Sequence, residues 1–405
     1  MLDACSGLSQ SPGMHDVVLR GGRDRSVRRR HPWVLSGSVD RVAGAAGEPE
    51  PGAEVRVLDA AGEVLGFGHY SPRSALRVRL HTFGKDEPED DWLARRIERA
   101  VARRRTDPTL ARTDAVRLVN AEGDGLPGLV ADRYGDVVVA RFATAGMATR
   151  RERVADALRA ATGAAAGFER GDSTAARREG MAARQGPLWG EPPGEPVTVR
   201  EGERRYRVDL VGGQKTGFYL DLRDARDRVE SEARGRRVLD AFAYTGGFGA
   251  AAARGGAASV TLVESSRPAL ALARENLALN AGVAATQLVA TDAFRYLRGE
   301  GERFDLLVLD PPPLARRRDD ARRAARAYKD LLLHALRRAS DDALVFAFRC
   351  SHAVGGELFR QIAFGASLDA GRPVQVAGAF TLPPDHPVAL DHPEGAYFGG
   401  LLLRT

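Results

Sequence analysis

The sequence predicts an α/β protein whose C-terminal half is a parallel β-sheet with helices on both faces. After residue 197, short apolar strands alternate with helical stretches, which is the pattern of a parallel sheet. Before residue 85 the chain consists mostly of short strands divided by glycine and proline. Between residues 90 and 196, helix and strand are mixed. We therefore expect three domains, over residues 15–85, 90–196 and 197–405.

The first region has the strand content of a small barrel. The pieces DVVLRGG, WVLSGSVDRV, AEVRVLDAAGEVLGFGHY and ALRVRLHTF are rich in strand-forming residues and are separated by glycine and proline. In the third piece, the turn D-A-A-G joins two alternating strands and predicts a hairpin.

The central region begins with a helix. In DWLARRIERAVARRR, Leu93, Ile97 and Val101 recur every four residues on one face, and arginines cover the other faces. The segment VRLVNAEGDGLPGLVADRYGDVVVARF then predicts a strand, a turn rich in glycine and aspartate, and two more strands. The stretch QGPLWGEPPGEP, which ends at Pro196, marks the next domain boundary.

The C-terminal region alternates strands with helices. Strands are expected in RRVLDAFAY, SVTLVES, TQLVATD, FDLLVLDPP and ALVFAFRC, and helices in RPALALARENLALN and ARRAARAYKDLLLHALRR. Two late strands, VQVAGAFTL and AYFGGLLLRT, have no helix between them and predict an antiparallel hairpin at one edge of the sheet.

Composition restricts the class of protein. Apolar residues make up 43% and charged residues 28% of the 405 residues, which is typical of a globular chain. No apolar run reaches the length of a membrane-spanning helix, and the N-terminus does not have the pattern of a secretory signal. The only two cysteines, Cys5 and Cys350, do not form a disulfide framework, so a cytoplasmic location is expected.

The basic residues indicate an anionic partner. The net charge is +6, and RGGRDRSVRRRHPW gathers arginines before a predicted turn. A solvated run of charge and a phosphate-contacting surface are equally compatible with this cluster.

A glycine loop follows the first strand of the C-terminal domain. In VLDAFAYTGGFGAAAARGGA, the loop precedes an alanine-rich helix whose N-terminus offers free N–H groups to a ligand. Gly247, Gly249 and Ala252 fit the dinucleotide pattern G-x-G-x-x-A. The negative charge of Asp240 opposes a pyrophosphate, however, and favours a cationic ligand such as S-adenosylmethionine (SAM). A nucleotide-dependent oxidoreductase is therefore disfavoured.

Acidic residues also end the next two strands. Glu264 ends the second strand, where it can accept both ribose hydroxyls. Asp292 follows the third, where it can accept from the adenine amino group. Three strand-end acids in this order predict a SAM site more specifically than the glycine loop does alone.

The fourth and fifth strand ends carry the candidate reactive groups. Asp310 lies in a loop like the D/N-P-P loop of amino-group methyltransferases, but Pro313 replaces their stacking aromatic and argues against an exocyclic amine as target. Cys350 lies beside this loop if the two strands are neighbours. His352, two residues on, is a candidate helper of the thiol.

A thiol at this place suits one reaction. A thiolate that adds to carbon 6 of cytosine makes carbon 5 nucleophilic enough to take a methyl group, and loss of the carbon 5 proton then expels the enzyme. The alternative is that Cys350 is a buried structural residue.

With these motifs in place, the chain resembles the PUA-domain-containing 23S rRNA cytosine-5 methyltransferases, the RlmI-like family, over roughly residues 15 to 405. RRRHPWVLSGSVDRV and GFGHYSPRSALRVRL are similar to its RNA-binding PUA domain, and AEGDGLPGLVADRYGD to its central α+β domain. GGQKTGFYLDLRDAR, LDAFAYTGGF, LDPPPLARRRDDARRAARAYKD, FRCSH and DHPEGAYFGGLLLRT are similar to its class I, Rossmann-like, SAM-dependent methyltransferase domain.

The resemblance implies SAM as cofactor, Cys350 and Asp310 as catalytic residues, and closure of GQKTGFYLD over the cofactor. The implied cofactor-binding residues are Gln214, Lys215, Phe218, Tyr219, Asp240, Phe242, Tyr244, Thr245, Gly246, Gly247, Glu264, Asp292, Ala293 and Asp310. The implied RNA-binding residues are Arg23, Arg28, Arg29, Arg30, His31 and Trp33.

The chain departs from the family at the substrate face. The family has D-P-P-K-F where this chain has Pro313 and Leu314, and small residues precede its cysteine where this chain has Phe348 and Arg349. The target nucleotide therefore stays open. One alternative is an rRNA methyltransferase that acts on another base or atom, and another is a non-catalytic rRNA-binding assembly factor.

The expected partner is ribosomal RNA of the large subunit, with the target base unpaired or flipped out. No membrane partner is expected, and a homodimer is compatible with the sequence. No metal site is expected either, because the histidines are scattered and no Cys/His spacing matches a ligand set.

Overall fold

The computed structural model divides into two compact units. It describes residues 14–44, 47–280, 285–314, 320–351 and 353–405. Unit 1 contains the described residues up to Thr106, together with Arg117–Pro192 and Val388–Pro393; unit 2 contains the described residues of Asp107–Val116, Pro193–Pro387 and Glu394–Thr405. Most residues of the first two predicted domains thus pack in one unit. Among the described residues, no helix has both the length and the apolar character needed to cross a membrane.

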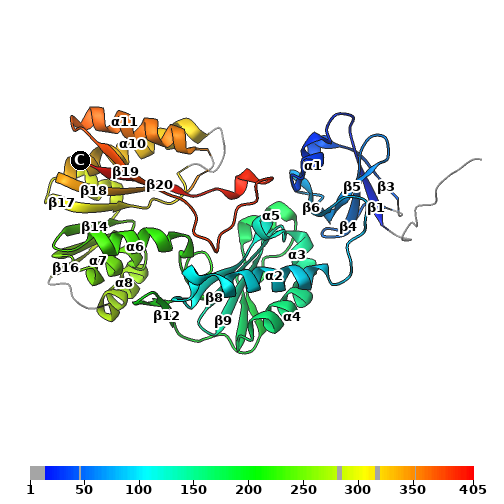
Figure 1. Cartoon of the computed structure of the whole chain (residues 1–405), viewed down its shortest axis with the longest axis horizontal. Coiled ribbons are helices and arrows are strands. Elements are labelled where there is room, and N and C mark those ends of the chain that lie inside the picture. Colours follow the sequence, from blue (N-terminus) through cyan, green and yellow to red (C-terminus); the bar gives the residue numbers. More distant parts are fainter. Residues whose placement is uncertain (1–13, 45–46, 281–284, 315–319, 352) are drawn as a thin grey trace, which may run out of the picture. The chain divides into compact units, whose positions relative to one another are not determined.

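The N-terminal part of unit 1 is a six-stranded sheet in the order β2-β6-β5-β4-β1-β3 (Figure 1). Its elements are β1 (His15–Leu19), α1 (Arg25–Arg28), β2 (Trp33–Leu35), η1 (Ser36–Ser38), β3 (Val39–Ala43), β4 (Glu54–Leu58), β5 (Val64–Tyr70) and β6 (Leu76–Phe83). The expected hairpin is present, because β4 and β5 pair antiparallel. Asp59 Oδ1 closes its turn by accepting from the N–H groups of Ala61 and Glu63, at 2.9 and 2.8 Å.

The following part contains a five-stranded sheet in the order β11-β10-β9-β8-β7. Its elements are α2 (Trp92–Thr106), β7 (Ala115–Asn120), η3 (Ala121–Asp124), β8 (Leu129–Tyr134), β9 (Val137–Phe142), α3 (Ala145–Thr149), α4 (Arg151–Thr162), β10 (Ala166–Glu169), α5 (Ser173–Glu179) and β11 (Gly186–Trp189). Between α2 and β8, the short turn η2 (Pro108–Leu110) and the first two residues of β7 belong to unit 2. The predicted helix face is confirmed, since Leu93, Ile97 and Val101 are buried in the core of this part.

Unit 2 is built on a seven-stranded sheet in the order β16-β15-β14-β17-β18-β20-β19 (Figure 1). The strands are β14 (Arg237–Ala241), β15 (Ser259–Glu264), β16 (Ala285–Ala290), β17 (Phe304–Leu309), β18 (Ala339–Arg349), β19 (Gln375–Phe380) and β20 (Gly399–Arg404). The first five are parallel, as expected, and the predicted antiparallel pair β19–β20 lies at one edge. A separate hairpin, β12 (Val197–Glu201) and β13 (Arg204–Val208), is one that the sequence pattern does not reveal.

Helices cover both faces of this sheet (Figure 1). One face is covered by α6 (Arg223–Glu232), α7 (Gly247–Arg254) and α8 (Arg267–Leu279), and the other by α9 (Ala293–Arg298), α10 (Ala321–Arg338) and α11 (Gly356–Ala370). Short turns are η4 (Leu220–Leu222) and η6 (Pro393–Gly395). Within β14, Val238 packs into the core on the face covered by α6, α7 and α8, and Leu239 packs into the core on the opposite face. A sheet buried on both faces explains why its strands are almost continuously apolar.

Candidate active site and basic surface

The carboxyl ends of β14, β15, β17 and β18 border a cavity of about 470 Å³. A ligand site at this edge is typical of open parallel sheets. The wall contains ten of the predicted site residues: Gln214, Lys215, Phe218, Tyr219, Phe242, Tyr244, Gly247, Glu264, Asp310 and Cys350. The topology of the sheet thus brings together residues from five separate segments of the sequence.

Five predicted cofactor-binding residues do not lie in this wall. Asp240 is buried beneath the glycine loop, where its Oδ2 accepts from the N–H of Gly249 at 2.8 Å. Asp292 is exposed and caps α9, with its Oδ1 accepting from the N–H of Arg295 at 2.8 Å. The other three are Thr245, Gly246 and Ala293. The structure therefore gives Asp240 and Asp292 local roles at helix starts, and ligand contact by these five residues stays a prediction.

Strained backbone gathers at the cavity. Lys215, Phe242 and Tyr244 have φ values of 51°, 66° and 48°, in the left-handed region that non-glycine residues rarely adopt. Such conformations cost about 1–3 kcal/mol each and persist where the surrounding structure holds them, commonly at ligand sites. All three side chains contribute to the wall, so the strain marks this cavity as functional.

Glu264 holds the strained loop in place. Its Oε2 accepts from the N–H of Tyr244 at 3.0 Å, and its Oε1 accepts from the N–H of Ser266 at 2.8 Å. A carboxylate has about four acceptor positions. Glu264 can therefore also accept from hydroxyl groups of a ligand in the cavity.

A lysine–carboxylate–tyrosine cluster forms another part of the site. Lys215 Nζ lies 2.6 Å from Asp221 Oδ2, which also accepts from the hydroxyl of Tyr397 at 2.8 Å. Lys215 Nζ lies 4.1 Å from the centroid of the Tyr219 ring, a cation–π distance. Sequence reasoning missed Asp221 and Tyr397, although both stand in the quoted motifs GGQKTGFYLDLRDAR and DHPEGAYFGGLLLRT.

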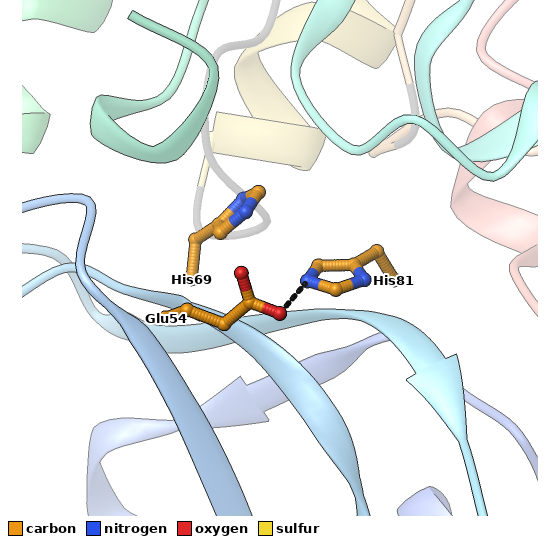
Figure 2. Close-up of side chains that lie close together, drawn as sticks. All are labelled: Glu54, His69 and His81. Atoms are coloured by element: carbon orange, nitrogen blue, oxygen red, sulfur yellow. Dashed lines mark ion pairs between the residues drawn. The ribbon is translucent and has the colours of Figure 1, made fainter. Parts of the chain in front are cut away.

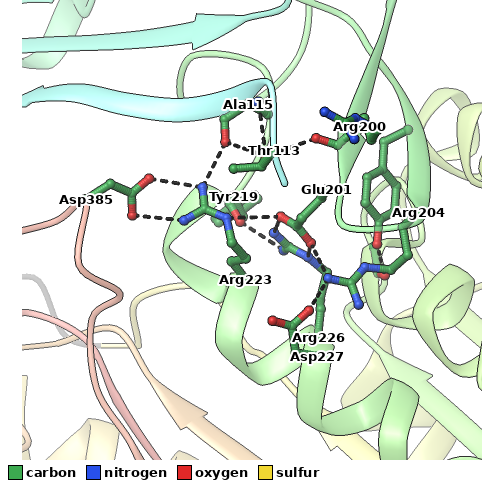
Figure 3. Close-up of polar contacts among 12 residues, drawn as sticks. Thr113, Ala115, Arg200, Glu201, Arg204, Tyr219, Arg223, Arg226, Asp227 and Asp385 are labelled. Atoms are coloured by element: carbon green, nitrogen blue, oxygen red, sulfur yellow. Dashed lines mark hydrogen bonds and ion pairs between the residues drawn. The ribbon is translucent and has the colours of Figure 1, made fainter. Parts of the chain in front are cut away.

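Arg226 lines the cavity and contacts two neighbouring residues of its wall; Figure 3 shows its polar contacts. Its Nη1 donates to the carbonyl of Tyr219 at 2.9 Å, and its guanidinium carbon lies 4.6 Å from the centroid of the Phe218 ring. Its Nε and Nη2 donate to the two oxygens of Glu201 at 2.7 and 2.5 Å. This fully buried bidentate pair fixes the segment that carries Phe218 and Tyr219.

Two further arginines share Glu201 (Figure 3). Arg204 Nη2 lies 3.0 Å and Arg223 Nε 3.8 Å from its oxygens. Arg223 also pairs with Asp385, at 3.0 and 3.1 Å. Burial by itself would raise the pKa of Glu201, but Arg226, Arg204 and Arg223 lower it to about 2.

Asp310 and Cys350 follow neighbouring parallel strands, as predicted. Burial raises the pKa of Asp310 to about 7; the charge of Asp221 adds to this rise, and Lys215 opposes it. Burial also raises the pKa of the Cys350 thiol, and the charge of Asp310 raises it further, while Lys215 lowers it. The site thus pairs a neutral thiol with a carboxyl group that titrates near neutrality. His352 lies outside the described residues.

The chemistry of the cavity suits SAM. The cations Lys215 and Arg226 in its wall pair with Asp221 and Glu201, so the carboxyl groups of Glu264 and Asp310 favour a ligand with a sulfonium and an ammonium group. Beneath the loop, Asp240 Oδ1 is buried and has no hydrogen-bond partner within the described part of the chain, and burial raises the pKa of Asp240 to about 8. Aromatic rings in the wall provide apolar surface for an adenine ring.

Asp310→Asn is expected to lower methyl transfer by about 10²- to 10⁴-fold, the usual contribution of an acid–base group. In the parent, kcat/KM should rise with pH through about 7, because Asp310 becomes a carboxylate there; the variant should lose this rise.

The same variant should be more stable at high pH. Between its ordinary value near 4 and about 7, folded Asp310 keeps a proton that the unfolded chain releases, so the stability of the parent falls as pH rises from about 4 to about 7. At pH 8 we expect Asp310→Asn to gain on the order of 2 kcal/mol in urea unfolding, about half the fully buried value because the carboxyl borders an open cavity. An unchanged kcat/KM in Asp310→Asn would contradict the acid–base role of Asp310.

The arginines predicted to contact RNA differ in the ion pairs that they make within the protein. Arg23 and Arg29 are exposed and make no ion pair with any described residue. Arg28, by contrast, pairs with Asp24, Asp59 and Glu63 at 2.5, 2.5 and 3.0 Å. A cation neutralised by three carboxylates is a weaker phosphate ligand, so its RNA contact is less favoured than the sequence indicates.

The other candidates lie near a groove of about 390 Å³ in unit 1. Arg30 lines this groove together with Arg96, Arg99 and Arg103. Trp33 donates from Nε1 to Glu122 at 2.8 Å, and its ring packs edge-on against the rings of His31 and His392. The indole is therefore partly engaged within the protein.

Family models match two parts of the chain. The model described as S-adenosylmethionine-dependent methyltransferase matches residues 146–342, and the model described as PUA-like domain matches residues 17–83. Two relatives carry the name ribosomal RNA large subunit methyltransferase I. The protein of Tolumonas auensis is 39% identical over 96% of this chain and 99% of its own length. That of Salmonella arizonae is 37% identical over 98% and 99%.

Solved structures share the fold. A methyltransferase solved in complex with SAH has a TM-score of 0.82 at 22% identity, over 96% of this chain and 100% of its own. A Streptococcus mutans protein described as SAM-dependent methyltransferase has a TM-score of 0.81 at 21% identity, over the same shares. The fold class expected from the sequence is thereby confirmed.

Proposed function

The chain belongs to the ribosomal RNA large subunit methyltransferase I family, and we propose that it methylates carbon 5 of a cytosine in large-subunit rRNA through a link to Cys350. The membership confirms the expected SAM cofactor and methyltransferase activity. One observation carries the finer proposal. The Cys350 thiol and the Asp310 carboxyl follow adjacent strands and border the same cavity as the candidate SAM residues.

In this proposal, each residue of the site has its own part in the reaction. When bound, SAM supplies the methyl group on a positively charged sulfur. Asp310 accepts the proton of the thiol, which its raised pKa allows near neutrality. Lys215 opposes the rise in the pKa of Cys350 that burial and the charge of Asp310 cause. The Cys350 sulfur then adds to carbon 6 of cytosine, and carbon 5, made nucleophilic by this bond, takes the methyl group. Loss of the carbon 5 proton to a base then restores the double bond between carbons 5 and 6, breaks the sulfur–carbon 6 bond and releases the Cys350 thiolate.

The basic part of unit 1 supports the choice of RNA as substrate. Exposed Arg23 and Arg29, together with the groove lined by arginines, suit phosphate contacts that weaken with salt. The relatives named ribosomal RNA large subunit methyltransferase I support ribosomal RNA as the substrate, and we propose that the protein works in the cytoplasm.

The proposal is tested with SAM labelled in its methyl group, unmodified large-subunit rRNA and the purified full chain. Digestion of the RNA and mass spectrometry of its nucleosides should find the label in 5-methylcytidine. Label in another nucleoside would show that carbon 5 of cytosine is not the methylated atom, and would favour a structural role for Cys350. The absence of label with demonstrated SAM and RNA binding, on rRNA and subunits alike, would favour an assembly factor.

Arg29→Ala should weaken rRNA binding and reduce the steepness of log Kd against log salt by about 1, because one phosphate contact is lost. Arg28→Ala is the matched comparison in the same helical turn. Since three carboxylates already neutralise Arg28, its removal should change the salt dependence by much less. Equal effects of the two variants in a salt titration would contradict this distinction.

A further inference from the structure

The N-terminal sheet contains a group of three side chains, two buried histidines and a half-buried glutamate, that can ligate a metal ion (Figure 2). Glu54, His69 and His81 come from β4, β5 and β6, which are neighbours in the sheet. One potential ligand atom of each lies within 4.8 Å of the other two, and His81 Nε2 lies 3.6 Å from Glu54 Oε1. Figure 2 shows the carboxylate between the two imidazoles.

Both histidines contain a buried nitrogen that has no hydrogen-bond partner among the described residues. These atoms are Nε2 of His69 and Nε2 of His81, and each residue is only 3% exposed. A buried polar atom without a partner costs about 1–3 kcal/mol. Two such atoms in a group of side chains that includes a carboxylate call for an explanation, and a bound ion is one.

Outer contacts orient two of the three groups. His81 Nδ1 lies 3.1 Å from Thr82 Oγ1, so a proton on Nδ1 leaves the lone pair of Nε2 for the ion. Arg150 Nη2 lies 3.1 Å from Glu54 Oε2, which leaves Oε1 on the side of His81. Metal ligands are commonly fixed by such partners.

Packing also holds the two rings. The His81 ring stacks on the ring of Trp92 with centroids 4.0 Å apart and planes inclined by 4°. The His69 ring lies so close to Gly146 that a Cβ there would be 2.3 Å from ring atoms. The ligand atoms are therefore held in place before any ion binds.

Three arginines near the cluster oppose a cation, but each is engaged. Arg150 pairs with Glu54, and Arg79 lies 2.9 Å from Glu179 Oε1. Arg96 donates to the carbonyl of Gly125 at 2.7 Å and to that of His81. The carboxylates of Glu54 and Glu179 offset two of these positive charges.

We propose that Glu54, His69 and His81 bind one zinc-like divalent transition-metal ion that ties β4, β5 and β6 together. Two imidazoles and one carboxylate are a known three-ligand set for Zn²⁺, and imidazole selects transition metals over Mg²⁺ and Ca²⁺. The strand pairing creates the set, which explains why spacing along the sequence does not reveal it.

The test uses the full chain, stripped with a chelator and titrated with Zn²⁺ or Co²⁺ alone. We expect one equivalent of metal in the protein after desalting, a visible absorption spectrum of tetrahedral Co²⁺, and a higher Tm with Zn²⁺. His69→Gln, His81→Gln and Glu54→Gln should each weaken binding at least about 100-fold, since even outer-shell changes cost 10- to 100-fold. The control His15→Gln, in β1 of the same sheet, should bind like the parent.

Two results would overturn the proposal. One is a folded parent chain, checked by circular dichroism, that retains no stoichiometric metal. The other is undiminished metal binding in all three ligand variants, which would place the ion elsewhere. Neither result depends on methyl transfer, so the metal site and the proposed function fail independently.

Discussion

Cys350→Ala is expected to reduce methyl transfer to rRNA by at least about 10³-fold, because removal of a covalent nucleophile eliminates the step that activates carbon 5. SAM affinity should change by less than about twofold, since the other wall residues are untouched. Single-turnover transfer of labelled methyl groups and calorimetric titration with SAM measure the two quantities separately. The half-buried position of Cys350 limits the expected loss of stability to about 1 kcal/mol.

The chain offers a matched control for this variant. Cys5 is its only other cysteine, and Cys5→Ala should retain full activity. Near-normal turnover of Cys350→Ala would show that the thiol is structural and that a different atom of the substrate is methylated. A raised thiol pKa in the absence of ligands does not by itself favour that outcome, because a bound cation in this acidic cavity lowers the pKa of a neighbouring thiol.

Glu201→Gln should destabilise the protein by about 3–5 kcal/mol, because it leaves the charges of buried Arg226 and Arg204 without their shared carboxylate. The pKa of Glu201 gives a similar size: lowering from 4.5 to about 2 corresponds to about 3 kcal/mol. Urea unfolding of parent and variant at pH 7 measures the difference. The KM for SAM should rise as well, since Arg226 positions Phe218 and Tyr219.

The pH dependence of stability gives an independent check on Glu201. A carboxyl whose folded pKa is depressed stabilises the folded state above its ordinary pKa, and this contribution is lost as pH falls from about 4.5 through 2. The variant should lack this part of the acid transition. Glu203→Gln is the matched control, since Glu203 is exposed and its ion pair among the described residues is with Arg112, at 2.8 Å; this variant should leave the urea midpoint nearly unchanged. Equal stabilities of the two variants would contradict the role of the buried network.

The sequence predicts the sheet and its reactive strand ends because these depend on local pattern. The apolar runs that end in Asp310 and Cys350 indicate buried parallel strands, and adjacent parallel strands place their ends side by side. The glycine loop before α7 is likewise visible as a motif, and Gly246 there adopts φ of 74°.

The missed features depend on contacts between distant segments. Glu201 lies in a hairpin without a sequence signal of its own, so its pairing with Arg226 and Arg223 becomes visible only in three dimensions. The sequence does not reveal the ion pairs of Arg28 with Asp59 and Glu63, because these two carboxylates come from the β4–β5 hairpin, 31 and 35 residues further along the chain. Local pattern therefore predicts elements better than it predicts which charges are already paired.

The most direct test of the central claim is to trap the link between Cys350 and the base. Large-subunit rRNA containing 5-fluorocytidine presents a carbon 5 that cannot lose a proton after methylation, so the sulfur–carbon 6 bond should persist. Incubation with SAM should give a protein–RNA complex that survives denaturation, and peptide mass spectrometry should locate the attachment at Cys350. The complex should be absent when SAM is omitted, and it should be absent in the Cys350→Ala variant. Methylation of natural rRNA without any trapped complex, or a complex that forms equally in Cys350→Ala, would contradict the proposed mechanism.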